Sequence, residues 1–78
     1  MGEKSVAQIK IITDVAGRVC AVAASAGGSI ENGGDVVFVE AMKMEIPVPS
    51  PAAGKITSIL VGIDDVVAEG QTIALLET

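Results

Sequence analysis

The sequence predicts an all-β domain folded as a flattened barrel or a two-sheet sandwich. Short runs rich in Val and Ile alternate with turn residues such as Gly27-Gly28, Asn32-Gly33-Gly34 and Asp64-Asp65. No stretch holds a helical period between capping residues, so no long helix is expected. A chain of 78 residues is one small domain.

An internal repeat supports this fold class. Residues 13–40 align without a gap with residues 50–77, at a constant offset of 54 − 17 = 37 positions. Apolar positions match in order along the two segments, and the identical pairs include Ala16/Ala53, Gly17/Gly54, Gly33/Gly70 and Glu40/Glu77. We interpret the pattern as a tandem duplication whose two halves close one core between them, related by a pseudo-twofold axis.

Six strands are expected from the runs of Val, Ile and Leu. Their ranges are 9–11, 18–23, 36–41, 44–48, 55–61 and 72–77. Phe38 is the one aromatic residue, so the core must consist of Val, Ile, Leu and Ala.

The predicted strands 36–41 and 44–48 are separated only by Met42-Lys43. A two-residue hairpin turn usually needs positive φ, and Met-Lys is a poor pair for it. With this turn, Ala41 pairs with Met44, and the numbers of any two paired residues in the hairpin sum to 85. Pro47 and Pro49 fall on the wide pairs 38:47 and 36:49, where a missing N–H costs the ladder nothing.

The same register sorts the side chains of the hairpin. Glu40, Glu45 and Phe38 share the outer face, so the tip is expected to be acidic around one cation. Met42 and Lys43 project from the turn, and methionine suits a surface that another protein grips. We therefore predict a lysine displayed for modification by a partner enzyme. The residues assigned to the core face are Val37, Val39, Ala41, Met44, Ile46 and Val48.

With these features, the sequence resembles a biotinyl domain, the biotin carboxyl carrier unit of the biotin/lipoyl attachment family. "EAMKME" (40–45) matches the family's biotinylation motif, and "SPAAGKI" (50–56) and "VVAEGQTIALLE" (66–77) match its second half. The resemblance implies a barrel-sandwich hybrid of two antiparallel four-stranded sheets. It covers residues 9–78 and leaves residues 1–8 as an N-terminal extension.

The resemblance implies that Lys43 carries covalent biotin and that no residue is catalytic or binds a metal. Glu40, Ala41, Met42 and Met44 would be recognised by a biotin protein ligase and by the carboxylase sites. The chain would be a non-catalytic subunit or domain. It would move carboxyl groups between the biotin carboxylase and the carboxyltransferase or decarboxylase sites of a biotin-dependent carboxylase.

Two departures from the family pattern concern loops. Family members often have Gly-Asp in the turn before the third strand of each half. Here Gly27-Gly28 keeps only the glycine and Asp64-Asp65 only the aspartate, and Asp tolerates the left-handed backbone. The gapless offset between residues 19 and 33 leaves no room for the protruding thumb of some bacterial carriers. A thumbless carrier indicates an acyl-CoA, oxaloacetate or amide carboxylating system rather than the thumb-bearing acetyl-CoA carboxylase subunit.

Three alternatives remain open. A lipoyl carrier domain of a 2-oxoacid dehydrogenase complex has the same fold, but its motif lacks the methionines on both sides of the lysine. A membrane-fusion adaptor barrel needs a helical insertion at the tip, where only Met42-Lys43 stands. An enzyme using Lys43 as a Schiff base needs a desolvated pocket, which a convex tip does not offer.

Composition bears on partners and location. A net charge of −5 argues against nucleic acid and anionic membranes as partners. The first residues lack the apolar segment of a signal peptide, and the lone Cys20 fits a reducing compartment. A cytoplasmic location is therefore expected.

Overall fold

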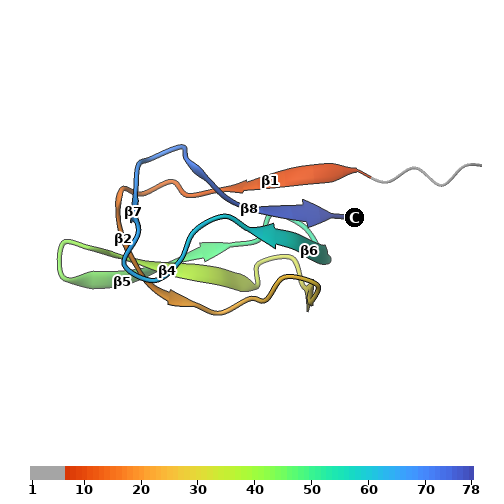
Figure 1. The fold of residues 1–78 in the computed structure, drawn as a ribbon, viewed down its shortest axis with the longest axis horizontal. Helices are drawn as coiled ribbons and strands as arrows, with labels where there is room; N and C mark the ends of the chain where they lie inside the picture. The colour runs from red at the N-terminus through yellow and green to blue at the C-terminus, as the bar shows by residue number, and fades with distance from the viewer. Residues whose placement is uncertain (1–6) are drawn as a thin grey trace, which may run out of the picture.

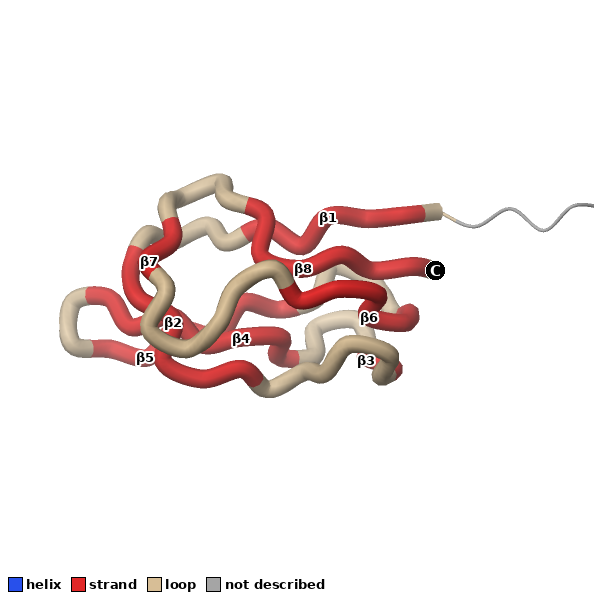
Figure 2. Tube along the Cα trace, viewed as in Figure 1, coloured by secondary structure: helices blue, strands red, loops and turns tan. Residues whose placement is uncertain are grey.

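The computed structural model describes residues 7–78, and all regular structure in that range is β-strand. Two antiparallel four-stranded sheets have the orders β1-β8-β6-β3 and β5-β4-β2-β7 (Figures 1 and 2). The predicted all-β class and two-sheet architecture are confirmed. The strands are β1 (Gln8–Ile12), β2 (Gly17–Val22), β3 (Ser29–Ile30), β4 (Asp35–Ala41), β5 (Met44–Pro49), β6 (Gly54–Ile59), β7 (Val66–Val67) and β8 (Thr72–Glu77).

The 37-residue offset relates the two sheets strand by strand. β2 corresponds to β6, β3 to β7, β4 to β8, and β5 to β1. The turns repeat as well. The amide of Gly27 donates to the carbonyl of Ile56, and the amide of Asp64 donates to the carbonyl of Val19, both at 2.7 Å. This correspondence is the pseudo-twofold relation that the sequence repeat predicts, and we call residues 37 positions apart mates.

All six predicted strands are present, with ends that differ by at most two residues from the expected ranges. The positions of β3 and β7, which complete the two expected four-stranded sheets, were not predicted, because two residues are too few to show a period. Pairing alone defines them: Ser29 lies opposite Lys55 on β6, and Val66 lies opposite Arg18 on β2.

The core of the described range lies between the sheets and contains no aromatic residue, as predicted. Two buried polar residues lie beside it at mate positions. The hydroxyls of Thr13 and Ser50 each donate, at 2.7 Å, to the carbonyl two residues later, in Val15 and Ala52. Each hydroxyl is thereby satisfied within its own turn. The fully buried apolar residues are Ile11, Val19, Val36, Val37, Val39, Val48, Ile56, Val67, Ile73, Ala74 and Leu76.

The register of the β4–β5 hairpin follows the sum of 85 from Ala41:Met44 down to Val37:Val48. One predicted pair is wrong, because Pro49 lies opposite Asp35 and not opposite Val36. A bulge between Asp35 and Val37 adds one residue to β4, and Val36 is buried in the core.

The domain has two ends, which we call the tip end and the back end. At the tip end, the turn Met42-Lys43 joins β4 to β5. At the back end, the equivalent strands β8 and β1 are antiparallel neighbours that no turn joins, and the amide of Thr78 donates to the carbonyl of Ala7 at 3.0 Å (Figure 1). The termini were predicted to lie together away from Lys43, and Ala7 and Thr78 do so. Val6, the mate of Lys43, lies outside the described residues.

The connection from β2 to β3 spans residues 23–28, and its mate from β6 to β7 spans residues 60–65. The equal lengths confirm that the first half has no thumb insertion. Across residues 7–78, no helix has the length and apolar character that crossing a membrane would require.

Candidate functional site

Lys43 occupies the apex of the β4–β5 hairpin. Met42 and Lys43 both have positive φ, at 51° and 64°, as the two-residue turn requires. The turn is closed by Ala41 and Met44, which lie opposite each other. The left-handed backbone costs each of the two central residues roughly 1–2 kcal/mol, so the chain maintains an unfavourable turn at this position.

The side chains of the turn are exposed. Met42 is 88% exposed, Met44 is 62% exposed, and Lys43 is exposed between them. Met44 was predicted to lie on the core face, and this is wrong. The hairpin extends past the rest of the domain (Figures 1 and 2). The side of the hairpin on which Met44 lies therefore has no opposite sheet to pack against at this point. Ala41 and Ile46, assigned to the same face, are half-buried.

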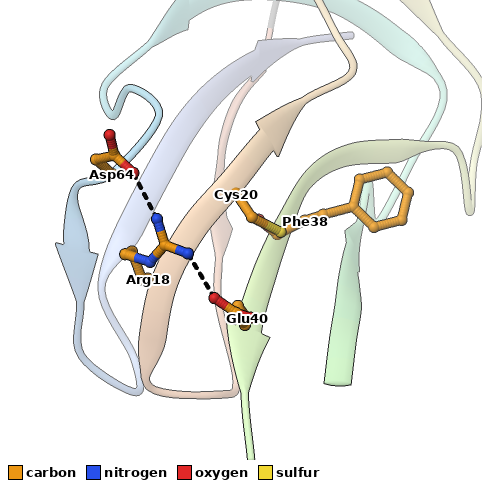
Figure 3. Close-up of polar contacts among 5 residues, drawn as sticks. All are labelled: Arg18, Cys20, Phe38, Glu40 and Asp64. Carbon is orange, nitrogen blue, oxygen red and sulfur yellow. Dashed lines mark hydrogen bonds and ion pairs between the residues drawn. The ribbon is translucent and has the colours of Figure 1, made fainter. Parts of the chain in front are cut away.

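Arg18 ties the base of the hairpin to the neighbouring loop. Its Nη2 lies 2.5 Å from Oε1 of Glu40 on β4, and its Nη1 lies 2.5 Å from Oδ1 of Asp64 (Figure 3). The hydrogen bonds to Glu40 and then to Asp64 raise the pKa of the Arg18 guanidinium above its ordinary value. This contact was not predicted from the sequence, because β7, which positions the loop against β2, was not recognised.

The predicted acidic tip is therefore only partly present. Glu40 and Glu45 lie directly opposite each other, as expected. Glu40, however, is engaged by Arg18 and is not part of a free acidic rim. Within residues 7–78, Lys43 forms no ion pair.

Asp64 keeps the turn that the family builds with glycine. It has φ of 78°, close to the 87° of its mate Gly27, so the expectation that aspartate preserves this turn is confirmed. The carboxylate of Asp65 accepts a hydrogen bond of 2.7 Å from the amide of Gly62 and closes the same loop.

Other candidate chemistry is sparse in the described part of the chain. Residues 7–78 contain no pocket and no group of three or more His, Cys, Asp or Glu arranged to hold a metal. Cys20 is half-buried, and its Sγ lies 3.5 Å from the carbonyl oxygen of Phe38 (Figure 3). Its mate Thr57 makes the equivalent contact with Leu75 at 3.2 Å, which gives Cys20 a structural role in the bulge.

Residues 5–76 match the family model described as "Biotin-requiring enzyme". The chain belongs to this biotin-requiring enzyme family. It is 36% identical over 63 residues to the "Biotinylated protein TB7.3 homolog" of Mycobacterium leprae, covering 81% of this chain and 89% of that protein.

Longer proteins contain a segment similar to this chain. The chain is 37% identical over 68 residues to the urea amidolyase of Saccharomyces cerevisiae, covering 87% of this chain but 4% of that protein. It superimposes on the crystal structure of the Kluyveromyces lactis urea carboxylase with a TM-score of 0.86 and 29% identity. That match covers 96% of this chain and 7% of the urea carboxylase chain.

The family and these relatives support a biotin carboxyl carrier domain with covalent biotin as the cofactor. The lipoyl alternative is not favoured, since the Mycobacterium leprae relative is named for biotin and the Kluyveromyces lactis structure for urea carboxylation. The tip fits such a group, because an exposed primary amine on a projecting turn can be reached from several directions by a modifying enzyme.

Proposed function

We propose that the chain holds biotin on the ε-amine of Lys43 and presents it to the active sites of a biotin-dependent carboxylase. The observation that carries this proposal is the position of Lys43 at the apex of a left-handed turn between the exposed side chains of Met42 and Met44. A structural role does not account for methionines at that exposure, since they bury little apolar area there.

Attachment needs one covalent step at Lys43. The unprotonated ε-amine attacks the carboxyl carbon of biotin, which the ligase has activated with ATP, so that an amide forms and AMP leaves. The amine must give up a proton as the amide forms, and residues 7–78 place no carboxylate within ion-pairing distance of it. The ligase therefore supplies the base that takes the proton.

The residues beside Lys43 have separate proposed roles. Met42 and Met44 provide adaptable apolar contact to the ligase and to the carboxylase sites. Ala41 closes the turn opposite Met44 and keeps the hairpin narrow. Glu40 holds the base of the hairpin through Arg18.

The carrier itself performs no catalysis in this proposal. Biotin supplies a ureido nitrogen that accepts and releases a carboxyl group, and the chain supplies orientation and reach. Tethering gives the cofactor a high effective concentration at both the biotin carboxylase and the carboxyltransferase or decarboxylase sites. The convex surface, which has no pocket within residues 7–78, supports a presenting role.

The test is incubation of the chain with a biotin protein ligase, ATP and biotin, followed by peptide mapping. One biotin on Lys43 is expected, and the net charge changes from −5 to −5 − 1 = −6 as an ammonium becomes an amide. Lys43→Arg keeps the charge and abolishes labelling, whereas Lys55→Arg and Lys10→Arg are labelled normally. Label on Lys55 or Lys10 would refute the assignment.

A further inference from the structure

The chain has few sulfur atoms, and the two thioethers of its described part flank Lys43. The sequence contains three methionines and one cysteine, with no tryptophan, tyrosine or histidine. Met1 lies outside the described residues, so Met42 and Met44 are the thioethers of residues 7–78. Oxidation converts a methionine thioether into a sulfoxide, which replaces an apolar group by a polar one. Thioether chemistry within residues 7–78 is therefore concentrated at the lysine that receives the proposed cofactor.

Both thioethers are open to solvent in the folded domain. Met42 is 88% exposed and Met44 is 62% exposed. The third sulfur of the described range is partly shielded, because Cys20 is half-buried in the β2–β4 bulge and its Sγ lies 3.5 Å from the carbonyl oxygen of Phe38. A dissolved oxidant can therefore reach Met42 and Met44 without any opening of the fold.

The fold does not depend on either methionine side chain. The mate of Met44 is Ala7, which pairs with β8 at the back end as Met44 pairs with β4 at the tip end. Met42 stands in the turn, and its side chain buries little surface. A sulfoxide at either position stays in water and needs no new partner inside the domain. Oxidation therefore changes what the turn offers to another protein while the domain remains folded.

The charge of the chain favours a neutral oxidant. A net charge of −5 repels anionic oxidants, whereas hydrogen peroxide is uncharged in neutral water. The thioether sulfur attacks one peroxide oxygen, so that an S–O bond forms, the O–O bond breaks and water leaves. The sulfur loses two electrons, and the peroxide gains them. Methionine sulfoxide reductases reverse the change: two thiols become a disulfide, and the oxygen leaves as water.

We propose that Met42 and Met44 form a reversible oxidation site for hydrogen peroxide, and that their sulfoxides slow the attachment of biotin to Lys43. The assignment rests on the proposed attachment of biotin to this lysine. A side chain beside the reacting amine gives up contact with water when the ligase binds, which costs little for a thioether. A sulfoxide oxygen is a hydrogen-bond acceptor, and burying it without a donor is unfavourable. The carrier therefore accepts biotin at full rate only while its methionines are reduced.

The test uses the wild-type chain before biotin is attached, so that the thioether of biotin itself is not oxidised. The chain is treated with hydrogen peroxide, catalase removes the excess, and peptide mapping locates the added oxygen, which is expected on both Met42 and Met44. The initial rate of biotinylation by a biotin protein ligase then falls about tenfold or more. Two methionine sulfoxide reductases, one for each sulfoxide epimer, restore the rate together with dithiothreitol.

The matched control combines Met42→Leu with Met44→Leu. This variant keeps Met1 and Cys20, so it reports any effect of oxygen added at those residues. Its rate of biotinylation after peroxide should equal its own rate without peroxide. Thermal unfolding of the oxidised wild-type chain checks the fold, and the midpoint should lie within about 2 °C of that of the untreated chain.

A second control removes the cysteine. Cys20→Thr places at this bulge the residue that its mate Thr57 already holds, with the equivalent contact to the carbonyl of Leu75. Peroxide should slow the biotinylation of Cys20→Thr as much as that of the wild-type chain.

The outcomes distinguish the oxidation site from the proposed function. If the untreated chain takes no biotin, both fail. If it is biotinylated and the sulfoxides at Met42 and Met44 leave the rate unchanged, the oxidation site is refuted while attachment at Lys43 stands. It is refuted as well if the double leucine variant loses rate as the wild-type chain does, or if the oxidised wild-type chain has unfolded.

Discussion

Arg18 and Glu40 face each other across the β2–β4 pair and are joined by a 2.5 Å ion pair, although the sequence separates them by a full strand and two loops. Through the same guanidinium, Asp64 is bound as well. The mates of these three residues are Lys55, Glu77 and Gly27, and no ion pair forms among them. The bridge therefore distinguishes the end that carries Lys43 from the end that does not.

Arg18→Met should loosen the hairpin base without unfolding the domain. Both ion pairs are exposed, so the loss of stability is small and shrinks as salt is added. Amide hydrogen exchange of Glu40 and Asp64 should accelerate relative to their mates. Equal protection in Arg18→Met and wild type would contradict the bridge.

Titration of Arg18 itself should not change its contribution to the stability of the fold across the usual pH range. Its pKa is raised in the folded state, so the stabilisation is complete below the unfolded value and is lost only as the pH rises through the folded one. That window lies in strongly alkaline solution. A difference in unfolding free energy between wild type and Arg18→Met measured near neutrality should therefore stay constant between slightly acidic and moderately alkaline buffers.

Met42→Asn should stabilise the domain. Met42 has φ of 51°, and asparagine tolerates the left-handed backbone better than methionine, so the free energy of unfolding should rise by about 0.5–1 kcal/mol. Met44→Asn, outside the left-handed turn, is the control and should bring no gain. Denaturant titration measures both, and a gain for Met44→Asn alone would contradict strain at the turn.

Replacing Met42 and Met44 together with Leu should alter recognition more than stability. Both side chains are largely exposed, so the unfolding free energy should change by no more than about 0.5 kcal/mol. The rate of biotinylation by the ligase should fall. A large loss of stability with an unchanged labelling rate would show that the methionines belong to the core.

Gly17→Ala and Gly54→Ala form a matched pair at mate positions. A Cβ at Gly17 would overlap the carbonyl oxygen of Glu40, and a Cβ at Gly54 would overlap that of Glu77. Each should cost about 1–3 kcal/mol of stability. Only Gly17→Ala displaces the hairpin strand, so only it should slow biotinylation when both variants are fully folded. Equal slowing would mean that the effect comes from general destabilisation.

A bulky protein fused after Thr78 should leave the rate of biotinylation of Lys43 nearly unchanged. Thr78 and Ala7 are hydrogen-bonded neighbours at the back end, remote from the β4–β5 turn. Spin labels at Ala7 and Thr78 should report a separation much shorter than that from either label to Lys43. Comparable separations would refute the pseudo-twofold arrangement.

Much of the fold could be predicted because the repeat and the hairpin are local patterns. The offset of 37 positions assigns every strand a mate, and Met42-Lys43 fixes the pairing from Ala41:Met44 to Val37:Val48. The pattern fails where one residue is inserted. The bulge at Val36 changes the partner of Pro49, and alternation cannot reveal such an insertion.

The surroundings of Lys43 were harder to predict than its position. The bridge from Arg18 to Glu40 and Asp64 depends on β7, a strand of two residues that is defined only by its pairing with β2. The exposure of Met44 depends on how far the hairpin extends past the other sheet, which is a property of the assembled domain. Both features come from contacts between segments far apart in the sequence.

The hydrogen bond between Thr78 and Ala7 means that the path of residues 7–78 is nearly a closed ring. Joining these two residues through a short turn would give β8 and β1 the same hairpin that β4 and β5 already have. The polypeptide could then be opened at another exposed turn, such as the one at Asn32-Gly33, with every strand keeping its neighbours. Because residue order and spatial arrangement are separable in this way, circular permutation can move the attachment point of a tether around the domain while the lysine keeps its place in space.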